Sequence, residues 1–260
     1  MNKQLTFLLS LIFLFMLSSF AFGEETEVKR EYWGNGQLKR ETHLRSGEKN
    51  GIETTWYESG GKTEESNFLN GDKDGASIFW DSDGRKKWQG HYAIGKLNGS
   101  VTRWYENGLK LDDHNYKEGI EVSSAEWYEN GNKKYEDDGH HHSTEWNENG
   151  NKIEERYLID GFNDDYDDGS LRYIVINFCS SGEKYMEANV KDFYLLDGLA
   201  RYFYRSGEIM RDEYYKDGKK EGLVTEWYES GRRKYELNYN NGEQIGLGTH
   251  WNKDGTIGLP

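Results

Sequence analysis

Short β-favouring runs alternate with glycine turns along the chain after residue 24, and aromatic residues recur at fixed places in that pattern. An aromatic lies four residues before each of ten glycines, and most of these glycines are 23 to 25 residues apart. A fixed period of this length indicates a repeat array, in which each repeat buries its face against its neighbours. The aromatics are Tyr32, Trp56, Trp80, Trp104, Trp127, Trp146, Phe178, Phe203, Trp227 and Trp251, and the glycines are Gly36, Gly60, Gly84, Gly108, Gly131, Gly150, Gly182, Gly207, Gly231 and Gly255.

Each repeat carries two turn signals and therefore two strands. The first signal is a sequence such as Glu106-Asn107-Gly108, where Asn-Gly supplies two residues that tolerate the positive φ of a tight hairpin turn. The second signal, Gly-x-x-x-Gly, as in Gly71 to Gly75, predicts a longer turn. A helix is excluded because, outside residues 183–197, no 14 consecutive residues of the repeats lack a glycine, and each glycine costs about 1 kcal/mol in a helix.

The pattern predicts an all-β fold, an elongated antiparallel meander of about ten β-hairpin repeats of ~24 residues that follows an N-terminal signal helix. Only 34% of the residues are hydrophobic, whereas 15% are aromatic, which is too many for a disordered chain. We therefore expect a core that is a thin layer of the recurring aromatics, because large rings carry most of the apolar area that can be buried.

Two intervals depart from the period. The interval 131–150 is only 19 residues long and contains Asp137-Asp138-Gly139-His140-His141-His142. The next interval, 150–182, is 32 residues long, and its extra residues form an acidic segment. These departures predict a repeat sub-array at 24–161, an acidic loop insertion at 162–169 and a second sub-array at 170–260.

The first 23 residues have the form of a secretory signal peptide. Lys3 precedes an apolar run of 13 residues that ends at Leu17, and Ala21 and Gly23 provide the small residues that signal peptidase requires before Glu24. The run is shorter than the ~20 residues needed to cross a bilayer. We expect an exported protein, periplasmic or secreted, that is soluble after cleavage near Gly23 and has no stable membrane insertion.

The repeat resembles a known family. The clearest copies consist of Trp-Tyr-Glu, then Asn or Ser, then Gly, and full repeats continue to a Tyr and to Asn-Gly-x-x-x-Gly. They resemble the MORN repeat variant, and such arrays are also the hallmark of the YwqK-like antitoxin family. The resemblance implies stacked β-hairpins that mediate interaction or scaffolding rather than chemistry. The clearest copies are Trp104-Tyr105-Glu106-Asn107-Gly108, Trp127-Tyr128-Glu129-Asn130-Gly131 and Trp227-Tyr228-Glu229-Ser230-Gly231.

Charge and motif content restrict the function further. The formal net charge of −14 excludes binding to a phosphate backbone through counterion release, and it favours a partner with a basic surface. The sequence contains no G-x-S-x-G elbow, no H-E-x-x-H and no phosphate loop, so we expect neither an enzyme nor a cofactor.

Two sets of residues are candidates for binding. The recurring tryptophans form either the sheet core or an exposed aromatic column that stacks on glycans or peptides. His140, His141 and His142, beside two aspartates, form either a transition-metal site or a polar loop. The tryptophans are Trp56, Trp80, Trp104, Trp127, Trp146, Trp227 and Trp251.

These observations favour an exported, non-catalytic repeat scaffold that mediates protein–protein interaction, with antitoxin-like or immunity-like binding of a basic partner as one form. The alternative is a cell-envelope module that binds cell-wall carbohydrate through exposed aromatics. A purely structural role in the envelope is the third hypothesis.

Overall fold

A computed structural model describes residues 25–159, 171–192 and 194–258. These residues form β-strands and turns, so the predicted all-β class is confirmed. The predicted signal segment at 1–23 and the predicted insertion at 162–169 lie outside the described residues. Among the described residues, no helix has the length and apolar character needed to cross a membrane.

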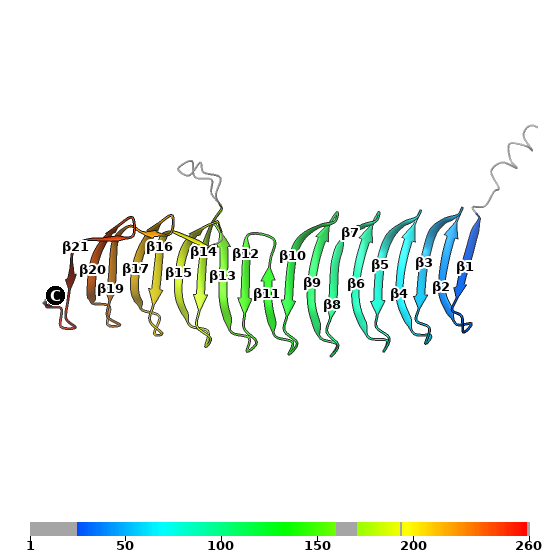
Figure 1. Ribbon diagram of the computed structural model, residues 1–260, viewed down its shortest axis with the longest axis horizontal. Coiled ribbons are helices and arrows are strands. Elements are labelled where there is room, and N and C mark those ends of the chain that lie inside the picture. Colours follow the sequence, from blue (N-terminus) through cyan, green and yellow to red (C-terminus); the bar gives the residue numbers. More distant parts are fainter. Residues whose placement is uncertain (1–24, 160–170, 193, 259–260) are drawn as a thin grey trace, which may run out of the picture. The chain divides into compact units, whose positions relative to one another are not determined.

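The strands belong to two units, unit 1 (Met1–Gly108 and Asn115–Ile120) and unit 2 (Leu109–His114 and Glu121–Pro260). Within each unit, neighbouring strands pair antiparallel in chain order, which is the predicted meander (Figure 1). Unit 1 contains β1 (Thr26–Tyr32), β2 (Leu38–Arg45), β3 (Glu48–Trp56), β4 (Lys62–Leu69), β5 (Asp72–Trp80), β6 (Lys86–Ala93), β7 (Lys96–Leu97) and β8 (Gly99–Trp104). Both units contribute to β9 (Lys110–Lys117) and β10 (Ile120–Trp127). Unit 2 contains β11 (Lys133–Asp137), β12 (His142–Trp146), β13 (Lys152–Leu158), β14 (Arg172–Phe178), β15 (Lys184–Lys191), β16 (Leu195–Phe203), β17 (Ile209–Lys216), β18 (Lys219–Lys220), β19 (Gly222–Trp227), β20 (Arg233–Asn240) and β21 (Glu243–His250).

The turn after each aromatic is longer than the sequence predicts. Between β3 and β4 the N–H of Tyr57 donates to the carbonyl of Gly61, and the N–H of Gly60 donates to the carbonyl of Tyr57, at 2.8 and 2.9 Å. Gly60 has a φ of 92°, so this turn has a left-handed glycine, as a three-residue hairpin loop requires. In the repeats that have an asparagine before this glycine, such as Asn130-Gly131, the asparagine does not have a positive φ. Its side chain bonds to the backbone instead, as Asn130 does with the carbonyl of Glu148 at 2.7 Å.

The tight turn lies at the second glycine. Asn70 and Gly71 have φ values of 50° and 89°. The residues on either side, Leu69 at the end of β4 and Asp72 at the start of β5, pair directly with each other. Two consecutive left-handed residues define the two-residue type I′ turn. The sequence-based assignment of the short and long turns is therefore wrong, because Asn-Gly occurs at both places and composition alone does not separate them.

Tyrosine hydroxyls join one repeat to the next. The tyrosine after the repeat aromatic donates to the backbone carbonyl of the aromatic in the following repeat. In unit 1, Tyr57 makes this bond to Trp80 at 2.9 Å. In unit 2 the same bond joins Tyr128 to Trp146, Tyr204 to Trp227 and Tyr228 to Trp251, at 2.8, 2.7 and 2.8 Å.

Removing one of these hydroxyls is expected to weaken the array slightly. Tyr228→Phe should lower the free energy of unfolding by about 1 kcal/mol, because it leaves a half-buried carbonyl without its donor. Urea denaturation followed by tryptophan fluorescence measures the change. Tyr185→Phe is the matched control, since Tyr185 is 42% exposed and has no side-chain hydrogen bond within the described part of the chain. Equal midpoints for the two variants would contradict the prediction.

Apart from Glu213, the most buried side chains are small, and the recurring tryptophans are only half-buried. Ser66 on β4 and Ser77 on β5 are fully buried and share a hydrogen bond of 2.5 Å between their hydroxyls. The expectation of a core that is a layer of large aromatics is therefore wrong. Within the described residues, the buried apolar side chains are Val101, Val175, Ala188, Val190, Ala200, Val224 and Leu237.

Unit 2 also buries a charged group. Glu213 on β17 is 2% exposed and accepts hydrogen bonds from Lys220 at 2.7 Å and from the Tyr215 hydroxyl at 2.6 Å. The guanidinium of Arg211 lies 3.2 Å from the same carboxylate. Burial by itself raises the pKa of Glu213, but the bonds from Lys220 and Tyr215 and the charge of Arg211 outweigh it, so the pKa lies below its usual value of 4.5.

Candidate functional site

The candidate tryptophans lie at the ends of strands, where a lysine covers several of them. In unit 1 the Lys62 ammonium lies 5.9 Å from the centre of the Trp80 ring. In unit 2 the Lys133 ammonium lies 5.6 Å from the centre of the Trp146 ring. The covering lysine comes two residues after the glycine of the preceding repeat, and its ammonium also bonds to the side chain three residues later, as Lys133 does with Glu136 at 2.7 Å and Lys86 with Gln89 at 2.8 Å. Trp104 and Trp127 are covered in the same way by Lys86 and Lys110.

The other three candidates also take part in the frame of the repeats. The carbonyl of Trp56 accepts a bond from the Trp33 indole at 3.0 Å, and Trp227 and Trp251 accept the tyrosine bonds described above. All seven tryptophans are half-buried. The rings of four of these tryptophans are thus covered by lysines, whereas Trp56, Trp227 and Trp251 contact the neighbouring repeat through their backbone carbonyls.

The three consecutive histidines do not converge. His140 and His141 are exposed in the turn between β11 and β12, whereas His142 is half-buried and stacks on Tyr157 with ring centres 4.4 Å apart. The Nε2 atom of His142 lies 3.2 Å from the Thr144 hydroxyl. Within the described ranges, no group of three or more His, Cys, Asp or Glu side chains is arranged to hold a metal ion.

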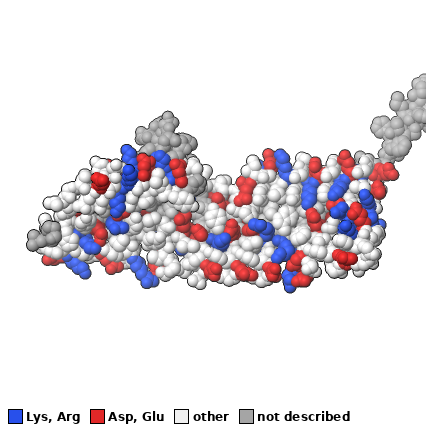
Figure 2. Space-filling model, viewed as in Figure 1, with Lys and Arg blue, Asp and Glu red and all other residues white. Residues whose placement is uncertain are grey.

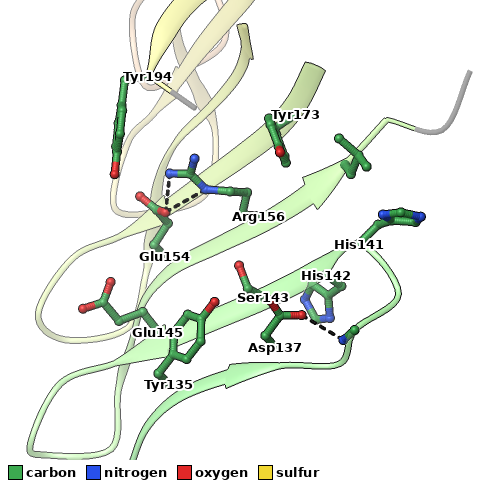
Figure 3. A pocket seen from close by; sticks show the side chains of 12 residues that line it. Tyr135, Asp137, His141, His142, Ser143, Glu145, Glu154, Arg156, Tyr173 and Tyr194 are labelled. Carbon is green, nitrogen blue, oxygen red and sulfur yellow. Dashed lines mark hydrogen bonds and ion pairs between the residues drawn. The ribbon is translucent and has the colours of Figure 1, made fainter. Parts of the chain in front are cut away.

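A hollow opens on one face of unit 2 at the shortened repeat. The strands β11 and β12 have five residues each, whereas the adjacent β10 and β13 have eight and seven. The hollow has a volume of about 490 Å³. Figure 3 shows side chains from β11, β12, β13 and β14 facing it, together with Tyr194 from the turn before β16. Acidic and basic side chains are interleaved over the face of the protein that Figure 2 shows.

An arginine held by rings and a carboxylate occupies one side of the hollow. The guanidinium of Arg156 bonds to Glu154 at 2.8 Å and lies 5.7 and 5.3 Å from the ring centres of Tyr173 and Tyr194. Its side chain is 14% exposed, whereas Tyr194 is 84% exposed. The tyrosines here therefore present π faces that already accept a cation.

The opposite side of the hollow is acidic and phenolic. Tyr135 lies opposite Glu145, and Glu145 lies opposite Glu154, in the pairing of β11, β12 and β13. The carboxylate of Glu145 has no hydrogen bond or ion pair with any residue that the structure describes. Burial raises the pKa of Tyr135, and the charge of Asp137 raises it further, so its hydroxyl stays protonated.

The turn beside the hollow depends on a glycine. Gly139 has a φ of 71°, and a Cβ added there would overlap the backbone carbonyl of Val122 on β10. Gly139→Ala is therefore expected to destabilise the protein by about 1–3 kcal/mol, because the turn must move and a left-handed alanine is strained. Thermal unfolding measures the loss.

The control for this substitution is Gly34→Ala. A Cβ at Gly34 meets nothing within 4 Å, and its φ is not left-handed, so its stability should change by no more than about 0.5 kcal/mol. If Gly139→Ala changes stability as little as Gly34→Ala does, the turn is not held in the described conformation.

The sequence singled out only part of this hollow. The irregular repeat points to Asp137, His141 and His142, whereas no pattern in the sequence points to the other polar residues of the hollow: Tyr135, Glu145, Glu154, Arg156, Tyr173 and Tyr194. The 19-residue interval was a usable signal, because a shortened hairpin between full-length neighbours leaves unfilled space. Pairing between β12 and β13 was needed to bring Glu145 and Glu154 together.

Comparison with known proteins supports the nature of the repeat. Residues 196–217 and 220–241 match the family model of the MORN repeat variant, and these segments include the repeats of Phe203 and Trp227. The MORN repeat part of the resemblance is thus supported, whereas the likeness to YwqK-like antitoxins stays a prediction. No curated protein has a significant match to the chain.

Two solved structures contain weakly similar segments. One is the crystal structure of TcdB2-TccC3-TEV, with 10% identity over 89% of this chain and a TM-score of 0.18. The other is a Tc holotoxin pore of Photorhabdus luminescens, with 12% identity over 88% of this chain and a TM-score of 0.16. The chain spans only 14% of the length of each. Scores this low carry no argument about function.

Proposed function

We propose that the chain is an exported, non-catalytic repeat scaffold that binds another protein. The observation that carries the proposal is the repeated use of tyrosine hydroxyls, tryptophan rings and lysine ammonium groups in contacts between neighbouring repeats. These residues recur because they hold neighbouring repeats together. The remaining surface is therefore available to bind a partner. Repeats of the matched family are generally protein-interaction or scaffold repeats.

The partner has a basic surface in this proposal. The chain has 47 acidic and 33 basic residues, and an acidic field speeds the approach of a basic protein and excludes acidic ones. Binding to a basic toxin domain, as an antitoxin or immunity protein does, is one form of this function. Rim charges of this kind change the rate of association more than the final affinity, so the interaction should be sensitive to salt.

The lysine positions weigh against the carbohydrate alternative. A sugar that stacks on an aromatic ring needs an open ring face. In unit 1 the ammonium groups of Lys62 and Lys86 lie over the rings of Trp80 and Trp104. A glycan would have to displace these cations, and they are held in turn by neighbouring side chains, as Lys62 is by Glu65 at 2.5 Å.

The test is a pull-down with the full chain tagged at its C-terminus and recovered from the exported fraction of the producing cells. Beads are washed at low and then at high salt, and the eluates are read by mass spectrometry. One dominant basic protein released by salt is the expected result. Absence of a captured protein, with the tagged chain retained on insoluble wall material at high salt, would reject the scaffold in favour of glycan binding.

The same preparation tests export. The mature N-terminus is read by mass spectrometry, and cleavage after Gly23 predicts that the chain begins at Glu24. The control is Leu11→Arg, which interrupts the apolar run and should leave the uncleaved chain in the cell. An uncleaved wild-type chain found inside the cells would reject the exported location and leave the binding proposal to the pull-down.

A further inference from the structure

We propose that the hollow at β11 to β14 binds a cationic side chain, the ammonium of a lysine or the guanidinium of an arginine, that the basic partner presents. This inference rests on the proposed function and names the place where the partner is held. Four observations support the inference: the space left by the shortened repeat, the charge of the hollow, one opposed pair of carboxylates and the tyrosines that line the hollow.

The space arises where two short strands lie between longer ones. Its volume of about 490 Å³ falls within the ~300–1,000 Å³ typical of ligand sites, so it is ample for one side chain. All residues that line it belong to unit 2. Figure 3 shows the carboxylates and the phenol rings directed toward the same space.

The charge of the hollow favours a cation. Its lining includes the carboxylates of Asp137, Glu145 and Glu154, and Arg156 is its only lysine or arginine among the described residues. Arg156 is already paired with Glu154. The hollow therefore keeps an excess of negative charge when Arg156 is accounted for.

The opposed carboxylates of Glu145 and Glu154 are the strongest argument for a cation at this place. Like charges on directly opposed residues of antiparallel strands are destabilising. Glu154 is already bonded to Arg156, whereas Glu145, an exposed residue, has no partner of its own within the described residues, so a cation beside Glu145 would remove the repulsion that remains. At the same place in other repeats the opposed residues are not two acids: Thr55 and Glu64, Phe79 and Trp88, Asn177 and Met186, Tyr202 and Arg211, and Glu226 and Tyr235.

The tyrosines supply the second part of a cation site. Tyr173 and Tyr194 already hold the guanidinium of Arg156, so a second cation would meet the ring of Tyr135. Tyr135 lies directly opposite Glu145, so a cation at Glu145 would have a phenol ring beside it. A carboxylate next to aromatic faces is the combination that binds ammonium and guanidinium groups in proteins.

The probes are three amides, N-acetyl-arginine amide, N-acetyl-lysine amide and the neutral N-acetyl-citrulline amide, titrated into the whole protein by calorimetry. We expect saturable binding of at least one cationic amide, weakened by salt, and about tenfold weaker binding of the citrulline amide. Comparison of the arginine amide with the lysine amide shows which of the two cationic side chains binds more tightly. Binding of citrulline amide as tightly as of the cations would overturn the proposal.

The variant is Glu145→Gln, and its matched control is Glu208→Gln in an exposed turn of the same unit. We expect about tenfold weaker binding of the cationic amide for Glu145→Gln and unchanged binding for Glu208→Gln. Because the substitution removes a repulsion, the free Glu145→Gln protein should melt no lower than the wild type, which separates lost binding from lost folding. Equal binding by the variant and the wild type would overturn the proposal.

The pull-down separates this inference from the function on which it rests. Capture of the basic partner by the wild type and its loss from Glu145→Gln would support both. Equal capture by the two would overturn the hollow as the contact and leave the scaffold function standing. If the wild type captures no protein, the scaffold function fails, and the amide titrations decide the cation site alone.

Discussion

Glu213→Ala is expected to lower the free energy of unfolding by about 3 kcal/mol, at the lower end of the ~3–5 kcal/mol lost when one partner of a buried ion pair is removed. The reason is that Lys220 and Arg211 lose the carboxylate that neutralises them in a buried part of unit 2. The lower end applies because Lys220 and Arg211 are 32% and 34% exposed, so water reaches them. Chemical denaturation measures the loss, with Glu208→Ala in an exposed turn as the control of equal charge change.

The same residue makes stability depend on pH. Because the pKa of Glu213 is lower in the folded protein than its usual 4.5, the carboxylate stabilises the fold fully above that value. The contribution is lost as the pH falls through the folded pKa. The stability difference between the wild type and Glu213→Gln should therefore be constant near neutral pH and shrink in acid below 4.5. A difference that stays constant into strong acid would show that the carboxylate charge does not matter.

Trp104→Ala is expected to have an effect of similar size in unit 1, about 3 kcal/mol. Truncation of a buried tryptophan costs ~3–5 kcal/mol, and Trp104 is half-buried, so the lower end applies. The substitution also removes the ring over which the ammonium of Lys86 lies, at 5.3 Å from the ring centre. Thermal and urea unfolding measure the change, and Trp104→Phe should recover a large part of it by keeping an aromatic face.

The matched control for Trp104 comes from the first repeat. Tyr32 holds the same position in the repeat but is 59% exposed at the end of β1. Tyr32→Ala should therefore change stability by no more than about 0.5 kcal/mol. If Trp104→Ala leaves the unfolding midpoint unchanged, the Trp104 ring does not stabilise the contact between repeats. That outcome would favour the alternative in which exposed aromatic rings bind a glycan.

Much of the fold could be predicted because the local signals repeat. The aromatic four residues before a glycine ends a strand in nine of the ten repeats, as Trp56 ends β3 and Trp80 ends β5, and Trp251 directly follows β21. The turn types and the core could not be predicted in the same way. The φ of Asn70 and the burial of Ser66 depend on how strands pair, and sequence spacing does not contain that information.

The hollow illustrates the same limit. Glu145 and Glu154 are nine residues apart in the sequence, and they face each other only because of the register between β12 and β13, which shifts at Trp146. The shortened interval was visible in the sequence, but a gap in spacing does not reveal which side chains surround the space. The histidines in that interval indicate a possible metal site in the sequence. In the structure, the carboxylates and tyrosines on the adjoining strands define the hollow.

The hydroxyl bond that joins several repeats to the next has a consequence for how the chain changes length. In unit 1, Tyr57 donates to the carbonyl of Trp80, and Lys62 covers the Trp80 ring. Deleting residues 61–84, one full period, would bring Trp104 to the place of Trp80 and Lys86 to the place of Lys62. The Tyr57 hydroxyl would again meet the carbonyl of a repeat tryptophan whose ring a lysine covers, so this contact between repeats is expected to survive the removal or addition of a whole repeat.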